Sequence, residues 1–270
     1  MKVLLIAPTF GSPLHISTLE HFKKLMKSEN FSFRSATGEI DKQIECFHKA
    51  LVENKPDVLI SFDVSPSEDI VLLYRENNIP IILVDEETRG ATTIATDNYA
   101  GGHIVGKYLI SKGKKKIAII TGTTEGPGSY NARLRLEGFK QALAEHNLTL
   151  PSYYTLVAPK YTREDGIELM PKLIEEKVDA IFCAAGDNCA QGLLAVAREQ
   201  KVRVPEDIAI VGFDDLPIAK LSTPELTTVR QPIKEIVDTA YRLAIEETKS
   251  ILYNPRKILF KPELIIRQSA

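Results

Sequence analysis

The feature that most constrains the fold is a succession of short apolar strands and helix-length segments that occurs twice along the chain. Residues 3–7 form a continuous aliphatic run, and a similar run at 116–121 opens an equivalent series. Segment 57–60 matches segment 179–182, and nearly the same number of residues separates these two segments as separates the two opening runs. Strands that are continuously apolar, and not alternating, are typical of parallel sheets buried on both faces. The sequence therefore predicts the α/β class.

The repeat also predicts two lobes in place of one extended sheet. A chain of 270 residues exceeds what one hydrophobic core usually organises, and equivalent strands at near-constant spacing indicate two similar halves. After the second series, a helix is expected from Pro232, followed by strand-like runs at 259–260 and 263–266. We predict a first lobe of residues 1–97 plus 230–253 and a second lobe of residues 98–229 plus 254–270.

Charge and cysteine content exclude several classes of function. The chain has 34 Lys and Arg against 36 Asp and Glu, so it lacks the basic excess of a surface that neutralises many phosphates. Its cysteines, Cys46, Cys183 and Cys189, form no CxxC pair and indicate neither a disulfide framework nor a zinc site. The aliphatic run at 3–7 ends at Pro8, too early for a signal peptide, and no run is long enough for a membrane helix. We expect a cytoplasmic protein with no membrane partner.

Sequence motifs for catalysis or for a cofactor are absent. The glycine-rich stretch 122–129 is not followed by the Gly-Lys-Ser/Thr of a phosphate-binding loop. Gly126 and Gly128 begin a dinucleotide-type glycine pattern, but Asn131 stands where its last glycine should be. Neither HExxH nor GxSxG occurs. We therefore predict no catalytic residue, no metal and no cofactor, and expect a binding protein in preference to an enzyme.

Polar side chains follow the predicted strands, where ligands bind in open parallel sheets. Asp187 begins a predicted helix, so we expect it to cap that helix more than to contact a ligand. We expect the reverse for Asp214, because Pro217 follows and no helical pattern begins at once. Arg135 lies early in a helix, where a cation opposes the helix dipole, and a surface salt bridge and ligand binding are equal alternatives for it. Tyr161 offers an apolar ring on which a hydroxyl-rich molecule can stack.

Five segments, in this order, carry a resemblance to a known family. They read TDNYAGG at 96–102, RLEGF at 135–139, VPEDIAIVGFDD at 204–215, TPELTTVRQP at 223–232 and PELIIRQS at 262–269. Together they resemble the effector-binding core of the lactose-repressor/purine-repressor family of bacterial transcription regulators, and more distantly the periplasmic sugar-binding proteins of the ribose type. The match runs through nearly the whole chain, and the last segment is typical of the regulators.

The resemblance implies a fold and a set of ligand contacts. The fold is two Rossmann-like lobes joined by three crossovers, near Asp97, 229–231 and 254–257, with a small effector in a cleft on which the lobes close. Asp187 is a further candidate contact, although Gly186 precedes it where many members have asparagine. The positions that match the family's effector contacts are Ser12, Leu14, His15, Asp97, Asn131, Arg135, Tyr161, Asp214 and Gln231. Of these, His15 stands where an aromatic ring is common, and the match favours ligand binding for Arg135.

The resemblance also implies partners. The effector is expected to be small and polar, a sugar or sugar phosphate ahead of a purine, and to be bound without turnover. A homodimer is expected, with DNA contacted only through a helix-turn-helix segment that precedes this core in the regulators and has no counterpart in these residues. We expect a regulator core from which that segment has been removed. The alternatives are a stand-alone ribose-type solute-binding protein and an enzyme on the same scaffold.

Overall fold

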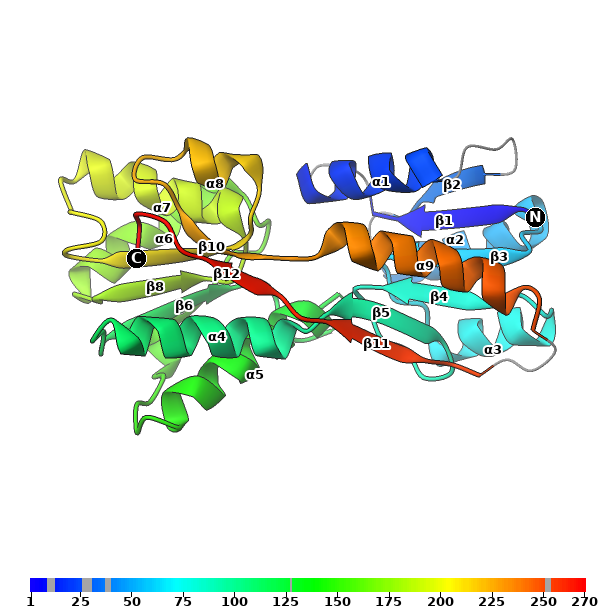
Figure 1. Cartoon of the computed structure of the whole chain (residues 1–270), viewed down its shortest axis with the longest axis horizontal. Coiled ribbons are helices and arrows are strands. Elements are labelled where there is room, and N and C mark those ends of the chain that lie inside the picture. Colours follow the sequence, from blue (N-terminus) through cyan, green and yellow to red (C-terminus); the bar gives the residue numbers. More distant parts are fainter. Residues whose placement is uncertain (9–12, 26–30, 37–39, 127, 251–253) are drawn as a thin grey trace. The chain divides into compact units, whose positions relative to one another are not determined.

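Each of the two repeats forms a sheet of six strands with helices on both faces. The computed structural model describes residues 1–8, 13–25, 31–36, 40–126, 128–250 and 254–270, which fall into two units (Figure 1). Unit 1 comprises Met1–Thr96 and Pro232–Phe260, and unit 2 comprises Asp97–Gln231 and Lys261–Ala270. The predicted α/β class, with two mostly parallel sheets, is confirmed.

Unit 1 has the strand order β11-β5-β4-β3-β1-β2, and all neighbouring strands are parallel. Its strands are β1 (Val3–Ala7), β2 (Phe31–Ser35), β3 (Val58–Phe62), β4 (Ile81–Val84), β5 (Thr92–Thr96) and β11 (Lys257–Phe260). Its helices are α1 (Pro13–Leu25), α2 (Ile40–Lys49), a π-helical turn (Ala50–Asn54), α3 (Glu68–Glu76) and α9 (Ile233–Glu247).

Unit 2 repeats this order as β12-β10-β9-β8-β6-β7, and only β12 runs antiparallel to its neighbour. Strand β7 begins at Thr155, directly after a 3-10 turn formed by Ser152–Tyr154. The strands are β6 (Ile117–Thr121), β7 (Thr155–Val157), β8 (Ala180–Cys183), β9 (Ala209–Asp214), β10 (Thr227–Arg230) and β12 (Glu263–Ile265). The helices are α4 (Asn98–Ser111), α5 (Tyr130–Ala144), α6 (Arg163–Glu175), α7 (Asp187–Glu199) and α8 (Pro217–Leu221).

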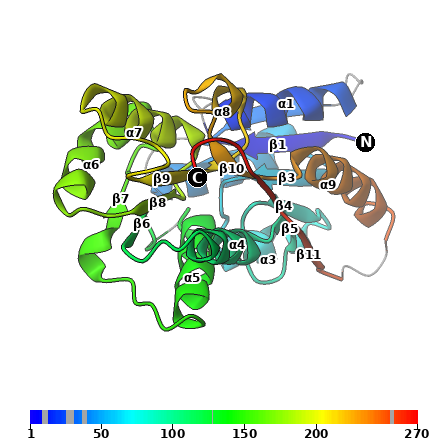
Figure 2. The same cartoon turned by 60° about the vertical axis from the view of Figure 1, so that its left-hand side comes forward.

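Both faces of each sheet are buried, as continuously apolar strands require. In unit 1, Leu4 and Ile6 of β1 pack in one cluster with Phe47 of α2, whereas Val3 and Leu5 belong to a cluster on the other face. Helices α1 and α9 lie side by side over this second face (Figures 1 and 2). In the described part of the chain, no helix combines the length and the apolar character needed to cross a membrane.

The third passage of the chain from unit 1 to unit 2 comes later than predicted. We expected residues 254–270 in the second lobe, but β11 pairs in parallel with β5 of unit 1. The chain leaves unit 1 after Phe260, and β12 then pairs with β10 of unit 2. The two strand-like runs of the tail are separated by Pro262, which lacks the N–H group that a ladder needs. The boundary between units 1 and 2 therefore falls between the two strand-like runs of the tail, and not before the first run.

Glycines set the distance between helices α4 and α5, which pack side by side in unit 2 (Figure 2). A Cβ atom at Gly138 of α5 would lie 1.9 Å from the carbonyl oxygen of Tyr99 in α4. A Cβ atom at Gly102 of α4 would lie 1.9 Å from the carbonyl oxygen of Arg135 in α5. Two helix backbones can approach this closely only where neither carries a side chain at the contact. The first turn of α4 is thereby fixed against α5 near Arg135.

We expect Gly138→Ala to destabilise unit 2 by about 2 kcal/mol or more, because the added methyl group meets backbone atoms that cannot turn away. The matched control is Lys140→Ala on the same helix, where the side chain is exposed and the change should be below about 0.5 kcal/mol. Urea unfolding followed by circular dichroism measures both variants. Equal stability of the two would contradict the close contact between α4 and α5.

Candidate functional site

The candidate site lies at the carboxyl ends of the strands, where the strand order changes direction. This point falls between β1 and β3 in unit 1 and between β6 and β8 in unit 2, and in each sheet the two strands are neighbours. Connections leave such a pair of strands toward opposite faces of the sheet, and ligands of α/β proteins bind in the crevice that results. Each unit carries its own set of polar side chains at this point.

Arg135, in the second turn of α5, is a buried cation held by neutral groups. Its side chain is 9% exposed, Nε donates to Asn98 Oδ1 (2.7 Å), and Nη1 donates to the carbonyl oxygen of Ala184 (2.9 Å). The guanidinium carbon lies 3.7 Å from the centre of the Phe213 ring. Among the described residues, no carboxylate pairs with Arg135 and no acceptor contacts Nη2. A guanidinium fixed in this way can make charge-assisted hydrogen bonds to an acceptor on a ligand.

The second arginine of the same helix, Arg133, makes an ion pair at the surface. Arg133 is half exposed, and its Nε lies 4.0 Å from Glu137 Oε1, four residues along α5. Exposed pairs of this kind contribute little to stability. The two arginines of α5 therefore have different environments, and only Arg135 belongs to the candidate site.

Asn98, the first residue of α4, connects Arg135 to a predicted contact residue. It is fully buried, accepts from Arg135 through Oδ1, and donates through Nδ2 to Asn131 Oδ1 (2.8 Å). Asn131 is partly exposed at the start of α5. Asp97 is also partly exposed, and its Oδ1 caps α4 by accepting from the N–H of Ala100 (2.9 Å). Our sequence reasoning missed Asn98, although it directly follows Asp97 in the TDNYAGG segment.

Tyr161 lies beyond β7 with an exposed ring. It is 40% exposed and has a φ of +58°, in the left-handed region. A Cβ atom at Gly122, after β6, would lie 1.7 Å from the Tyr161 hydroxyl oxygen. Because only glycine leaves room for the ring at this point, Gly122 places Tyr161 against the end of β6. The ring can there offer an apolar face to a ligand.

Asp214, the last residue of β9, is joined to Gln231, which follows β10. Gln231 Nε2 donates to Asp214 Oδ1 over 2.6 Å, and Asp214 remains partly exposed. Its φ is +105°, a conformation that residues other than glycine rarely adopt and that is concentrated at functional sites. The next residue, Asp215, instead pairs with Arg230 and Arg267 and anchors the loop after β9. Asp214 thus keeps part of its surface exposed at the strand end, whereas Asp215 has a structural role.

The structure places Asp187 differently from both interpretations of the sequence. Its side chain does not cap α7, whose N-cap is Gly186. Its carboxyl is fully buried, with Oδ1 accepting from Thr228 Oγ1 (2.6 Å) and Oδ2 from the N–H of Leu216 (2.7 Å). Burial first, and then the charge of Asp214, raise its pKa well above the usual range. With both carboxyl oxygens bonded internally, Asp187 joins the start of α7 to β10 and to the loop after β9.

In unit 1, one hydrogen bond joins the start of α1 to the end of β3. His15 Nε2 donates to Asp63 Oδ2 (3.1 Å), and the His15 ring meets Phe62 edge-on with 5.3 Å between ring centres. The side chain of Leu14 is partly buried. Of the contacts predicted in this unit, Ser12 lies outside the described residues. Through this hydrogen bond with His15, Asp63 becomes a further candidate contact residue, one that the resemblance did not indicate.

A second residue of unit 1, Glu86, was missed by our sequence reasoning. It follows β4, is only 2% exposed, and its Oε1 has no hydrogen-bond partner in the described structure. Burial raises its pKa to about 8, and the charges of Asp63 and Asp85 act in the same direction, against a hydrogen bond from Ser65. Glu86 is therefore mostly protonated at pH 7. The run Asp85-Glu86-Glu87 is typical of a solvated turn, so nothing in it marked Glu86 as buried.

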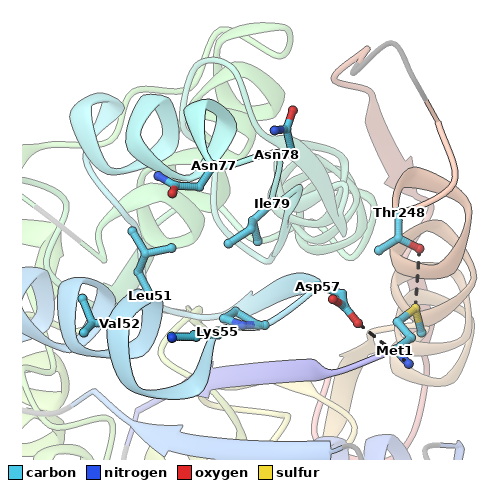
Figure 3. A pocket seen from close by; sticks show the side chains of 10 residues that line it. Met1, Leu51, Val52, Lys55, Asp57, Asn77, Asn78, Ile79 and Thr248 are labelled. Atoms are coloured by element: carbon cyan, nitrogen blue, oxygen red, sulfur yellow. Dashed lines mark hydrogen bonds and ion pairs between the residues drawn. The ribbon is translucent and has the colours of Figure 1, made fainter.

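A surface hollow of about 860 Å³ lies at the amino ends of the strands of unit 1, opposite the carboxyl ends described above (Figure 3). It is lined at the amino ends of the strands by residues that include Met1, Asp57 and Ile79, and by Thr248 after α9. None of the predicted contact residues lines it. Within the described ranges, no group of three or more His, Cys, Asp or Glu is arranged to hold a metal ion.

Comparison with known proteins gives this arrangement a context. Residues 107–270 match the family model described as a periplasmic binding protein-like domain. The HTH-type transcriptional repressor PurR of Proteus mirabilis is 30% identical over 98% of this chain and 78% of its own length. The structure of the transcriptional regulator CelR in complex with cellobiose aligns with 100% of this chain over 84% of its own chain, at 23% identity and a TM-score of 0.85. A LacI family transcriptional regulator of Enterococcus faecium with bound ribose covers 100% and 98%, at 22% identity and a TM-score of 0.83.

Glu86→Gln should weaken the pH dependence of stability. Between the ordinary carboxyl pKa of 4.5 and about 8, the folded protein holds the Glu86 proton and the unfolded chain does not, so the free energy of unfolding falls as pH rises. From pH 5.5 to 7.5 this contribution is about 2–3 kcal/mol, and glutamine removes it because it does not titrate. Part of the slope should remain, since the pKa of Asp187 is also raised.

Urea unfolding at the two pH values measures this effect. Glu87→Gln, which changes the exposed neighbour, is the control and should keep the full slope. If the wild-type protein and Glu86→Gln lost equal stability between pH 5.5 and 7.5, the buried acid would not be the source.

Proposed function

The chain belongs to the LacI family of transcriptional regulators, of which it forms the effector-binding domain, and we propose that the effector is a sugar. The observation that carries this proposal is the guanidinium of Arg135, buried at the strand ends of unit 2 and held by neutral groups only. Because its Nη2 contacts no acceptor among the described residues, a ligand hydroxyl or ring oxygen can supply the missing contact.

The other polar groups of unit 2 suit a ligand with many hydroxyl groups. Asn131 places an amide group at the start of α5, and Asp214 and Gln231 place a carboxylate and an amide at the ends of β9 and β10. Tyr161 adds an exposed ring, and sugars stack their apolar C–H faces on such rings. Two proteins with this fold have been solved with sugars, ribose in one and cellobiose in the other, which supports the same class of effector here.

Unit 1 bears on the charge of that sugar. The carboxylate of Asp63 lies at the end of β3, beside the buried acid Glu86, and a phosphate group would meet the Asp63 carboxylate with a charge of the same sign. We therefore favour a sugar without a phosphate group over a sugar phosphate. A purine is the weaker candidate, because it would use few of the hydroxyl-binding groups of unit 2.

The proposal includes the action of the effector on the regulator. We propose that the sugar is bound without turnover and that binding shifts the two units toward a closed arrangement, to the extent that the sugar binds this arrangement more tightly. Contact with DNA is assigned to a helix-turn-helix segment, since this chain carries 34 basic against 36 acidic residues and has no basic excess. We also propose that the domain forms homodimers.

Arg135→Met and Asp214→Asn should each weaken sugar binding by about 10- to 150-fold, the effect of losing one charge-assisted hydrogen bond in a closed site. The matched control is Arg133→Met, which removes the exposed arginine of the same helix and should leave the affinity unchanged. Isothermal titration calorimetry against a panel of hexoses, pentoses and disaccharides measures the affinities. Equal affinities of wild type and both site variants for a sugar that binds would remove these residues from the site.

Scattering experiments test the two remaining parts of the proposal. Light scattering at micromolar protein should give twice the chain mass of 30.0 kDa. A monomer would favour the alternative of a stand-alone solute-binding protein. Small-angle scattering should show a smaller radius of gyration when the sugar is bound, and an unchanged radius would contradict closure.

A further inference from the structure

Three carboxyl groups of unit 1 gather where β3 and β4 end, and we refer to Asp63, Asp85 and Glu86 as the acidic cluster. Asp63 and Asp85 directly follow the two strands, and both have left-handed φ values, of +53° and +60°. Because β3 and β4 are parallel neighbours, these two turns lie next to each other at the carboxyl ends of the strands. Two non-glycine residues in this conformation at adjacent strand ends suggest a function for the loops.

Glu86 is the member of the acidic cluster that has an unbonded oxygen atom. Only 2% of the residue is exposed, and Oε1 has no hydrogen-bond partner in the described structure. Buried polar atoms are normally bonded, so an unbonded carboxyl oxygen indicates a position that a ligand group fills. The carboxyl group of Glu86 lies near the other two acids, because Asp63 and Asp85 both act on it electrostatically and in the same direction.

The groups around Glu86 carry no strong positive charge. Asp63, Ser65 and Asp85 are the groups that act on its carboxyl, and no lysine or arginine is among them. His15, which donates to Asp63 Oδ2 over 3.1 Å, is the basic side chain joined to the cluster by a described contact. The local potential is therefore negative, and the complementary ligand group is a cation.

We propose that the acidic cluster of unit 1 binds a primary ammonium group of the effector, which is therefore an amino sugar. This inference rests on the proposal that the effector is a sugar. An ammonium group is compact and has three N–H donors, so it can donate to Asp63 and to Glu86 Oε1 at the same time. A metal ion suits the cluster less well, because no group of three ligating side chains is arranged around one point in the described ranges.

Proton release is a specific consequence of this arrangement. The pKa of Glu86 is about 8 in the sugar-free protein, so below pH 7 its carboxyl is neutral. A bound ammonium group favours the charged carboxylate, and the Glu86 proton then passes to solvent as the hydrogen bond from the ammonium forms. A neutral hydroxyl has no such effect. At pH 6.5, binding of an amino sugar should release about one proton, whereas binding of a neutral sugar should release none.

The test is calorimetry at pH 6.5 with glucosamine, galactosamine and mannosamine, each beside its parent hexose and its N-acetyl derivative. We expect at least one amino sugar to bind tenfold or more tightly than both of its neutral partners. In Glu86→Gln and in Asp63→Asn, the ratio of the amino-sugar affinity to the neutral-sugar affinity should fall toward one. In Glu87→Gln, which changes the exposed neighbouring carboxylate, this ratio should stay as in wild type. Titrations in buffers of different ionisation enthalpy should show the released proton in wild type and not in Glu86→Gln.

Two results would overturn the inference while leaving the proposed function intact. One is a neutral sugar that binds through Arg135 as tightly as its amino counterpart. The other is an amino-sugar preference that both Glu86→Gln and Asp63→Asn retain.

If no sugar of the panel binds, methylammonium chloride decides between the two proposals. A melting temperature raised relative to sodium chloride at equal ionic strength, in wild type and not in Glu86→Gln, would support the ammonium site and count against the sugar. No difference between the two salts would overturn the ammonium site as well.

Discussion

The burial of both faces of two parallel sheets is the constraint on which the rest of the structure depends. Strands such as β1 and β3 are fully buried along their length, so they offer no position for a polar side chain that a ligand could reach. Polar chemistry is therefore confined to the strand ends, where helices begin and loops turn. Asp63 and Glu86 lie in the loops after β3 and β4, Asp214 is the last residue of β9, and Arg135 lies in the second turn of α5. The same constraint explains the left-handed residues of the site, because the chain has to turn sharply from a buried strand into a loop.

Local pattern predicted the elements well, because a parallel strand buried on both faces is a property of consecutive residues. The two sheets, the helix after Pro232 and both tail strands follow from such patterns, and the error at the third crossing concerned only which sheet the strand 257–260 joins. That choice depends on pairing between distant segments. Site residues were harder for the same reason. Asp187 and Asp214 are both aspartates near strand ends, and only the tertiary hydrogen bonds from Thr228 and Leu216 distinguish the buried one.

Arg135 and Glu86 show two ways to keep an ionisable group buried. The guanidinium cannot lose its proton, so its charge is spread over neutral acceptors and the Phe213 ring. The carboxyl of Glu86 can become neutral, and burial among other acids keeps its proton in place. The first group has the same charge before and after a ligand arrives. The second can gain or lose its charge, and the proposed response to an ammonium group depends on this property.

The order in which the chain is made has a consequence for how these sheets mature on the ribosome. The strand β11 covers the outer edge of β5, and β12 covers that of β10, yet both come from the last 14 residues, 257–270. Helix α9, which completes one core of unit 1, is also made after nearly all of unit 2. During synthesis, therefore, β5 and β10 have open edges, and an open edge is where a second nascent chain can add a strand. Unit 1 is completed by residues 232–260 and unit 2 by residues 261–270, so neither sheet has its full set of strands until these late segments have been made.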